Sequence, residues 1–448
     1  MHLGAFLIAG PCAHSHALWR HPDGEAGFLD PRYYERIAVT LERGLFDFAF
    51  FADRLAMSST YGDGHETGAR FGDQDSTRLD PMLVTALMAA VTRFLGLAAT
   101  RSTTYFPPYQ VARAFATLDH LSKGRAGWNV VTSVNEGEAR NHGLEAHLGH
   151  DARYDSADEF MDVVFRLWES WDADALVLDR ENGIYADPDR VHPLRHRGPN
   201  LRCDGPLNIP RSPQGRPVII QAGASARGKD FAARWAEVVF ALQPTTSGMQ
   251  RFYADLKAAV ERAGRPADAC RILPAVMPFV SESRAEAEEK LARHNELVHS
   301  LVGLSTMSSH MNFDFAKLPI DQPLGAVEVQ GMQGMLAAVR TLDPSGELTL
   351  GEIGRRYGQS VLVPQVAGTA RDVADRLEAW FGEHAADGFM ISPAYLPGGF
   401  DDFIRGVVPE LQRRGLFRSF YTGSTLRENL FGTASVHREA SDLQGASA

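Results

Sequence analysis

Short runs of apolar residues alternate with amphipathic patterns along most of the chain. The runs are rich in β-branched and aromatic residues, which is typical of strands buried on both faces of a parallel sheet. Turn-forming residues separate each run from the helical pattern that follows it. We therefore expect buried strands at Gly4–Ala9, Phe46–Ala52, Leu95–Thr100, Ala126–Val131, Val218–Gln221, Val238–Leu242, Ile272–Val280 and Gly388–Ser392.

The segments between these strands repeat apolar residues at helical spacing. Thr369 and Asp372 form a capping pair in front of one such segment,. Eight strands with intervening helices fit a (β/α)₈ TIM barrel better than an open doubly wound sheet. Pro274 and Pro278 weaken the prediction of the seventh strand. We expect helices over Tyr33–Arg43, Pro81–Thr92, Val111–Leu121, Ser247–Ala263 and Arg284–Val302.

Three stretches do not fit a minimal barrel, and we interpret them as insertions into a single α/β barrel domain spanning residues 1–448. Residues 58–80 are polar and glycine-rich, residues 172–215 are dense in Pro, Asp and Arg, and residues 304–359 show weak periodicity. Long loops in compact domains are commonly binding elements or lids. Surface decoration without a binding role is the alternative.

Composition narrows the class of protein. The 448 residues are 44% hydrophobic and 23% charged, with a formal net charge of −11, which gives no electrostatic footprint for nucleic acid,. No apolar segment approaches the length of a membrane span, and the N-terminal apolar run fits a first strand better than a signal peptide. Cys12, Cys203 and Cys270 are too few and too widely separated for a disulfide framework or a thiolate metal site,. These features favour a cytoplasmic enzyme.

The stretch Val218–Glu237 carries the clearest functional signal. Its buried strand ends in small residues, and helical spacing begins directly afterwards. A small-residue turn in front of a helix leaves backbone N–H groups free and lets an anion approach closely. Ser225 adds a hydroxyl where a phosphate would sit. An ordinary β–α turn is the alternative for this segment taken alone.

Polar residues also follow the other predicted strands. Asp53 ends the second strand, Thr103 and Thr104 follow the third, and Asn129 and Ser133 lie on and after the fourth. In a barrel the carboxyl ends of the strands form one mouth, so these side chains should ring it together with the anion-binding turn. Each residue alone is also compatible with a helix cap, a turn or a satisfied buried amide.

Hydroxyls, amides and one carboxylate beside an anion-binding turn suit a large neutral heterocycle that carries a phosphate. A divalent metal would need several carboxylates or imidazoles, so we expect none. The chain has no Gly-x-Ser-x-Gly elbow, and Gly62-Asp63-Gly64 is not a dinucleotide fingerprint,. His14-Ser15-His16 has the spacing of two zinc ligands in barrel hydrolases, but the later strand ends supply no matching histidines.

Longer motifs give the chain an almost end-to-end resemblance to the flavin-dependent monooxygenases of the bacterial luciferase-like superfamily. The most similar group contains the oxygenase components for nitrilotriacetate, dibenzothiophene sulfone, pristinamycin and long-chain alkanes. The matching segments are ALWRHP (17–22), FDFAFFAD (46–53), STTYFPPYQVAR (102–113), LDHLSKGRAGWNVVTS (118–133), HDARYDSADEF (150–160), QAGASARG (221–228), GTARDVADRLE (368–378), DGFMI (387–391), VVPELQRRGLF (407–417) and TLRENLFG (425–432).

This resemblance implies a barrel that binds reduced, diffusible FMN supplied by a separate NAD(P)H:flavin reductase, and a homodimer or homotetramer. It implies His16 and His310 as candidate catalytic residues, in the first loop and the third insertion. The implied flavin-binding residues are Asp53, Thr103, Thr104, Asn129, His150, Tyr154 and Ser225. The implied residues of the substrate pocket are His14, Trp19, Phe51 and Tyr105.

The chemistry implied by the resemblance is monooxygenation through a C4a-(hydro)peroxyflavin, in which one oxygen atom of O₂ passes to a small organic substrate. A site of this kind must exclude water. A deazaflavin- or flavin-dependent dehydrogenase on the same barrel, and a flavin-binding protein without catalysis, are the alternatives. The residues that select the substrate are expected in the three insertions. Degradation of a foreign compound is one role that the resemblance implies for the enzyme.

Overall fold

The computed structural model describes residues 1–329, 333–340, 343 and 345–432. Eight parallel strands close into a barrel, so the predicted fold class is confirmed. Each predicted strand is present, with its ends shifted by at most a few residues. In order around the barrel the strands are β1 (His2–Ile8), β2 (Phe48–Ala52), β3 (Gly96–Ser102), β4 (Ala126–Val131), β9 (Val218–Gln221), β10 (Val238–Ala241), β11 (Arg271–Val280) and β13 (Gly388–Ile391).

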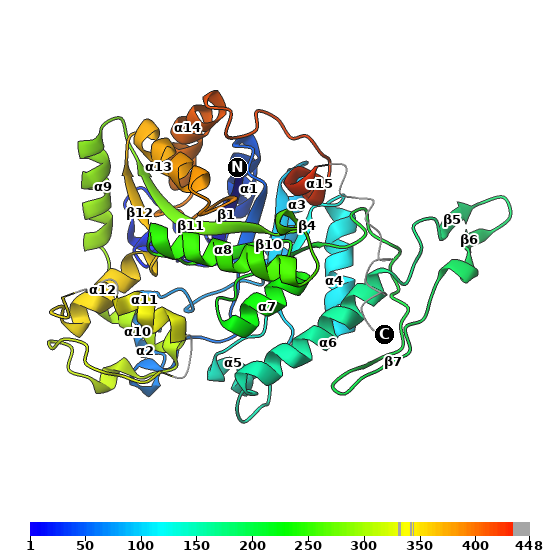
Figure 1. Ribbon diagram of the computed structural model, residues 1–448, viewed down its shortest axis with the longest axis horizontal. Helices are drawn as coiled ribbons and strands as arrows, with labels where there is room; N and C mark the ends of the chain where they lie inside the picture. The colour runs from blue at the N-terminus through cyan, green and yellow to red at the C-terminus, as the bar shows by residue number, and fades with distance from the viewer. Residues whose placement is uncertain (330–332, 341–342, 344, 433–448) are drawn as a thin grey trace.

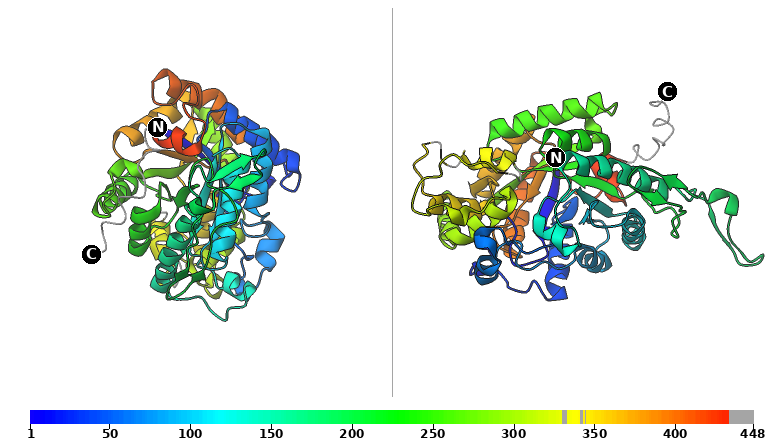
Figure 2. Two further views of the ribbon diagram at one scale, coloured as in Figure 1. Left: turned by 90° about the vertical axis from the view of Figure 1, so that its right-hand side faces the viewer. Right: turned by 90° about the horizontal axis from the view of Figure 1, so that it is seen from below.

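Helices surround the barrel, as Figures 1 and 2 show. Asp30 and Asp80 begin two of them alike, because each side chain accepts a hydrogen bond from a first-turn N–H and each is followed by proline,. Thr369 and Asp372 form the expected capping box. The surrounding helices are α1 (Pro31–Arg43), α3 (Pro81–Val91), α4 (Pro108–Leu121), α6 (His150–Trp168), α7 (Ala226–Trp235), α8 (Thr246–Arg262), α13 (Ala370–Gly382) and α14 (Gly398–Arg413).

Two local expectations need correction. The helix predicted over Arg284–Val302 is two helices, α9 (Arg284–Glu296) and α10 (Ser300–Met311), because the His299 side chain caps a new helix start. A short strand that the sequence did not reveal, β12 (Gln365–Gly368), pairs with the last part of β11 outside the barrel. Strand β11 accommodates both of its prolines: Pro274 faces β10, whereas Pro278 lies in the extension that faces β12.

The segments predicted as insertions contribute no strand to the barrel. The first contains η2 (Tyr61–Asp63) and α2 (Glu66–Phe71), and the third contains part of α10 with η5 (Phe315–Lys317), α11 (Gln333–Arg340) and α12 (Leu350–Ser360). The second forms an arm that projects away from the body, at the end opposite to α10–α12 (Figure 1). The arm contains the hairpins β5 (Leu176–Asp179) with β6 (Ile184–Ala186) and β7 (His196–Arg197) with β8 (Arg202–Cys203).

The C-terminal helix α15 (Leu426–Phe431) packs near the amino-terminal ends of the strands. Leu426 and Leu430 are buried in the core, and Arg427 forms an ion pair with Glu237 at the start of β10. None of the helices described is both long enough and apolar enough to cross a lipid bilayer.

Barrel enzymes carry their active sites at the carboxyl ends of the strands, the end of the barrel opposite to α15. A functional site is therefore expected at that end.

Candidate active site

The turn after β9 has the geometry of an anion site. Ser225 is the N-cap of α7, and its Oγ accepts a hydrogen bond from the Gly228 N–H at 3.0 Å. A β-carbon built on Gly223 or Gly228 would lie 2.9 Å from the Tyr154 hydroxyl. Glycine at both positions therefore keeps a narrow space open beside the free N–H groups of the helix start.

Helix α6 brings two further groups to this turn. His150 and Tyr154 lie one helical turn apart, so both side chains reach the same side of α6,. His150 Nε2 lies 3.2 Å from the Ser225 Oγ. Burial raises the pKa of Tyr154, while hydrogen bonds to the hydroxyls of Ser225 and Thr132 oppose that rise. The structure thus brings His150 and Tyr154 of α6 next to Ser225, which lies about 70 residues further along the chain.

Two buried amides at the ends of β4 and β9 have incomplete hydrogen bonding. Asn129 donates from Nδ2 to the Thr100 Oγ1 at 2.8 Å, but its Oδ1 has no hydrogen-bond partner among the described residues. Gln221, the last residue of β9, likewise has a buried Oε1 without a partner in the described part of the chain. Orphaned buried acceptors are rare and indicate a missing donor. Sequence reasoning missed Gln221, although its position at a strand end was a usable signal.

Asp53 lines a small cavity at the ends of β2, β3 and β4. Burial raises the pKa of its carboxyl to about 7, and the nearby Arg78 guanidinium opposes the rise. Its Oδ1 accepts a hydrogen bond from the Arg54 N–H at 2.9 Å. The cavity is lined by Asp53, Leu55, Thr100, Arg101, Ser102, Phe106, Val131, Ser133 and Glu138.

The threonines after β3 are held against β4. The Thr104 hydroxyl donates to the Thr132 carbonyl oxygen at 2.7 Å, and the Thr103 hydroxyl to that of Val131 at 3.4 Å. Ser133 has a φ of +54°, a conformation that costs a non-glycine residue free energy and that clusters at functional sites,. Because the hydroxyl protons of Thr103 and Thr104 are directed to backbone oxygens of β4 and the residue after it, only the lone pairs of these hydroxyls are free to accept hydrogen bonds.

Aromatic rings fill the barrel centre beneath the mouth. Phe6 stacks on the His14 ring with centroids 3.7 Å apart, and Phe50 and Phe240 surround Phe6 at 5.6 and 5.2 Å. His14 Nδ1 lies 2.8 Å from the Ser392 Oγ. Burial lowers the pKa of His14 to about 3, so its imidazole is neutral at physiological pH.

Phe51 does not line the pocket, contrary to expectation. Successive residues of a strand point to opposite faces, so Phe50 faces the barrel interior and Phe51 faces outward. Phe51 is fully buried against α1, with its ring centroid 6.2 Å from that of Tyr34. On this strand it is Phe50, with its ring centroid 5.6 Å from that of Phe6, that faces the barrel interior.

His16 ties the third insertion to the barrel. Its Nδ1–H donates to the Gly358 carbonyl oxygen of α12 at 2.9 Å, and its Nε2 accepts from the Thr306 hydroxyl of α10 at 2.7 Å,. Burial lowers the pKa of His16. Both ring nitrogens of His16 are therefore engaged with the third insertion, and its acid–base role stays a prediction.

His310 lies in the same insertion and is buried on α10. Its Nδ1 is 2.6 Å from the Tyr357 hydroxyl of α12. Burial lowers the pKa of His310, and the Arg54 guanidinium lowers it further. Burial raises the pKa of Tyr357. Both groups are therefore neutral, and the Tyr357 hydroxyl donates a hydrogen bond to His310 Nδ1.

A buried ion-pair cluster, which sequence reasoning missed, joins the second strand to the first and third insertions. Asp75 forms ion pairs with Arg54 at 2.9 Å and with Arg78 at 2.7 Å. Burial would raise the pKa of Asp75, but the two guanidinium groups outweigh burial and hold it below its usual range. Ser309 of α10 bonds to the same cluster. Charge compensation therefore helps to fix α10 over the mouth.

The remaining two predicted pocket residues lie at the rim. The Trp19 side chain is 41% exposed, and its Nε1–H donates to the Phe71 carbonyl oxygen of the first insertion. Tyr105 is partly buried, with its hydroxyl 2.8 Å from His147 Nε2 and its ring stacked on His142. Trp19 thus supports the first insertion instead of lining the central pocket, and Tyr105 covers the edge near α5 (Glu136–Asn141).

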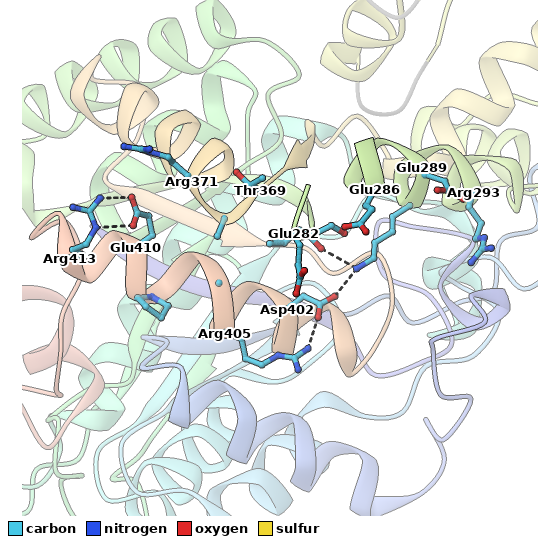
Figure 3. A pocket seen from close by; sticks show the side chains of 16 residues that line it. Glu282, Glu286, Glu289, Arg293, Thr369, Arg371, Asp402, Arg405, Glu410 and Arg413 are labelled. Carbon is cyan, nitrogen blue, oxygen red and sulfur yellow. Dashed lines mark hydrogen bonds and ion pairs between the residues drawn. The ribbon is translucent and has the colours of Figure 1, made fainter. Parts of the chain in front are cut away.

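A separate hollow lies outside the barrel between α9 and α14 (Figure 3). Its wall carries acidic and basic side chains in equal measure. Asp402 pairs with Lys290 and Arg405, and Glu410 pairs with Arg413. Charged side chains that pair with one another therefore make up much of this lining. In the described part of the chain, no group of three or more His, Cys, Asp or Glu residues could hold a metal ion.

Comparisons with known proteins agree with this geometry. Residues 12–387 match the model of the luciferase-like monooxygenase family. Dibenzothiophene-sulfone monooxygenase of Rhodococcus erythropolis (strain XP) is 53% identical over 435 residues, covering 96% of each chain. The crystal structure of DmoA from Hyphomicrobium sulfonivorans superposes with a TM-score of 0.90 at 36% identity, covering 97% of this chain and 93% of that one. That of a riboflavin lyase with modified FMN and riboflavin gives 0.88 at 34% identity, covering 97% and 96%.

Proposed function

This chain belongs to the luciferase-like monooxygenase family, and from that premise we propose that it is the oxygenase component of a two-component, FMN-dependent monooxygenase. The observation that carries the proposal is the convergence of Ser225, His150 and Tyr154 on an open helix start, next to orphaned amide acceptors. A phosphate and a flat ring with N–H donors are the two halves of reduced FMN, and the mouth offers complementary groups to both.

The phosphate would sit at the start of α7. Ser225 Oγ, His150 Nε2 and the Tyr154 hydroxyl supply polar groups there, and Gly223 and Gly228 keep the space free of β-carbons. The helix macrodipole favours an anion at this point. Arg227 lies in the first turn but pairs with Asp155 and Asp158, so the helix start itself provides the main attraction.

The ring would lie across the ends of β2, β3 and β4. The free Oδ1 of Asn129 would accept a hydrogen bond from a ring N–H group, whereas Gln221, whose amide lies beside Gly223 and Tyr154, would border the phosphate. Asp53 would hold a proton on its carboxyl below about pH 7 and accept a hydrogen bond above it. Thr103 and Thr104, whose hydroxyl protons point to backbone oxygens, would face the ring with oxygen lone pairs.

When bound, reduced FMN would supply the activation of O₂ and the transfer of one oxygen atom to the substrate. The protein would orient the substrate and exclude water, and its aromatic floor of Phe6, Phe50 and Phe240 suits an apolar substrate,. His14, neutral and hydrogen-bonded to Ser392, would border that floor, and the Tyr357 hydroxyl would keep its proton directed to His310 Nδ1.

The proposal includes partners. A relative is named component A of a nitrilotriacetate monooxygenase, which supports a separate reductase as the source of FMNH₂. Two further relatives are named subunits A and B of pristinamycin IIA synthase, which supports an assembly of similar chains. The three free cysteines, two of them buried, agree with a reducing cytoplasm,.

The test supplies photoreduced FMN under nitrogen, admits oxygen in the presence of catalase, and scores candidate substrates by product mass. Dibenzothiophene sulfone is the first candidate because of the 53% identical relative. We expect a gain of one oxygen atom that depends on both FMNH₂ and O₂, and no product with NADH alone. Turnover with a reduced deazaflavin in the absence of oxygen would instead identify a dehydrogenase.

A further inference from the structure

The first loop, residues 9–17, forms neither helix nor strand, yet all of it is buried. It carries His14 and His16, and side-chain hydrogen bonds hold it in place. Cys12 donates from Sγ to the Gly72 carbonyl oxygen of the first insertion, and His16 bonds to the third insertion. The loop is therefore tied to a different insertion on either side of His14.

Ser15, between the two histidines, is bound to another element. Its Oγ lies 2.6 Å from the Nε2 of His294 on α9, and both residues are completely buried. The Ala17 N–H donates to the same Oγ at 3.1 Å. Of the 13 residues of α9, Ala287 and His294 are the buried ones. A largely exposed helix thus directs its histidine inward to the first loop.

The hydrogen bonds of His294 determine which ring nitrogen carries the proton. Nδ1 lies 2.9 Å from the Asn295 Oδ1, an atom that also accepts from the Gln365 Nε2 at 3.0 Å. An amide oxygen only accepts, so Nδ1 carries the hydrogen and Nε2 accepts a hydrogen bond from the Ser15 hydroxyl. Burial lowers the pKa of His294 to about 4, which keeps the ring neutral near pH 7. A chain of hydrogen bonds therefore runs from Ser15 through α9 to β12.

We propose that His294 is a positioning residue of the active site, which holds His14 against the aromatic floor by binding Ser15. The His14 ring stacks on Phe6, and its Nδ1 meets the Ser392 Oγ. One peptide bond joins His14 to Ser15, so fixing Ser15 restricts the backbone at His14. The link to α9 keeps His14 in place when either insertion moves. The role of His14 beside the substrate rests on the proposed function, whereas its position does not.

The first experiment follows the position of His14 without flavin or substrate. Diethyl pyrocarbonate acylates accessible neutral imidazoles, and peptide mass spectrometry reads the extent at each histidine. In the wild type we expect His14 to react far more slowly than the exposed His384. His294→Leu and Ser15→Ala should each raise the rate at His14 about tenfold, the effect of losing one buried hydrogen bond. The double variant should be no faster than either single variant, because both changes remove the same bond.

Two further variants separate positioning from a general loss of stability. His294→Gln keeps an acceptor for the Ser15 hydroxyl and should restore most of the protection of His14. Ala287→Gly destabilises α9 at its other buried residue and should leave His14 protected,. Thermal unfolding by circular dichroism confirms that each variant is folded. Ser15→Ala removes a single oxygen atom and decides the result if His294→Leu does not fold.

The second experiment measures turnover with FMNH₂ and O₂. We expect kcat/KM for the organic substrate to fall about tenfold in His294→Leu and to recover in His294→Gln. The dissociation constant of FMNH₂ should stay unchanged, since the residues proposed to bind it lie on other elements. Ala287→Gly should change neither quantity.

Three results would overturn the proposal: a His14 that stays protected in folded Ser15→Ala, equal exposure of His14 in Ala287→Gly, and an unchanged kcat/KM in a variant that exposes His14. A failure of the proposed function looks different. The reactivity of His14 would then follow the expected pattern in every variant, while no substrate gained oxygen in the presence of FMNH₂.

Discussion

Asp53 is the residue of the site whose surroundings disfavour its charged form. Burial raises its pKa to about 7, so folding of the flavin-free protein is opposed by ionisation of this carboxyl. A group whose pKa is raised on folding stabilises the protein fully below its unfolded value, near 3.8,. That contribution is lost as the pH rises through about 7,. At alkaline pH, the folded flavin-free protein should therefore contain a buried Asp53 carboxylate that lowers its stability.

Asp53→Asn should relieve that cost. We expect the free energy of unfolding of the flavin-free protein to rise by about 1–3 kcal/mol at pH 8.5 and to stay unchanged at pH 4, where both side chains are neutral. Urea denaturation at the two pH values measures the difference. Asp230→Asn, on the exposed side of α7, is the control and should show no pH-dependent gain. An equal gain at both pH values would contradict a raised pKa.

Ser225 and Thr245 allow the phosphate assignment to be separated from helix capping. Each caps a barrel helix, and each accepts a hydrogen bond from a glycine N–H three residues on. Replacing either by alanine should cost about 1 kcal/mol of stability. Only Ser225→Ala should also reduce the preference for FMN over riboflavin, which lacks the phosphate, measured by fluorescence titration. Equal loss of preference in both variants would refute the assignment.

Where a candidate residue lies at a helix start or within one helical turn of another, its position can be read from the sequence. The place of Ser225 at the start of α7 and the i, i+4 pair His150 and Tyr154 on α6 follow from local chain geometry, whereas their binding roles stay predictions. The contacts of His16 do not follow from local geometry, because its partners Gly358 and Thr306 lie about 300 residues further along the chain. Phe51 was expected in the pocket, but strand parity turns it toward Tyr34 of α1,.

At the scale of elements, close packing of α10 against α12 holds the third insertion together. A β-carbon on Gly303 would overlap the Gly354 carbonyl oxygen, and one on Gly354 would lie 2.5 Å from the Leu304 Cγ. The helices can therefore approach closely only because both positions are glycine. Hydrogen bonds from α10 to His16 and Asp73 then fix the pair to the barrel.

Gly303→Ala should force α10 and α12 apart. Overpacking of this kind costs about 1–3 kcal/mol, and we expect faster amide hydrogen exchange confined to these two helices. Gly325→Ala, in the same insertion but with no heavy atom within 4 Å of the built β-carbon, is the control. If exchange rose instead throughout the barrel, the insertion would not be a separate unit of stability.

Barrel elements were predictable from the sequence because burial on both faces leaves a continuous apolar run. The exposed or half-exposed elements were not. Strand β12 is short and only partly buried, so its sequence, QVAG, carries no strand signal. The division between α9 and α10 was hidden because both sides of the break continue a helical pattern, and only the His299 cap marks it.

On the scale of the whole molecule, the strand order follows from the alternation of strands and helices, but the closure of the barrel base does not. Arg427 of α15 forms two hydrogen bonds with the Glu237 carboxylate, at 2.8 and 2.9 Å, across 190 residues of sequence. It also donates to the carbonyl oxygens of Gln214 and Arg216. No local sequence pattern predicts such a contact between α15 and the start of β10.

Glu237 depends on Arg427 for its charge. Burial would raise the pKa of Glu237, but the guanidinium of Arg427 outweighs burial and holds the pKa below its usual value of 4.5. A group whose pKa is lowered on folding contributes stability above its unfolded pKa. That contribution disappears as the pH falls through the folded value. The wild type should therefore lose the stability supplied by this pair on acidification below about pH 4.5,.

Arg427→Met should leave a largely buried carboxylate without its partner. We expect a loss of about 3 kcal/mol at pH 7, measured by urea denaturation, and a smaller loss at pH 4, where Glu237 can take up a proton. Adding Glu237→Gln should recover much of the loss at pH 7, because the unpaired charge is then gone. Arg405→Met, which breaks an exposed pair with Asp402, is the control and should change stability by less than about 1 kcal/mol,. If the stability losses of Arg427→Met and Glu237→Gln simply added in the double variant, the two side chains would act independently. The apolar contacts of Leu426 and Leu430 would then be what holds α15 against the amino-terminal end of the barrel.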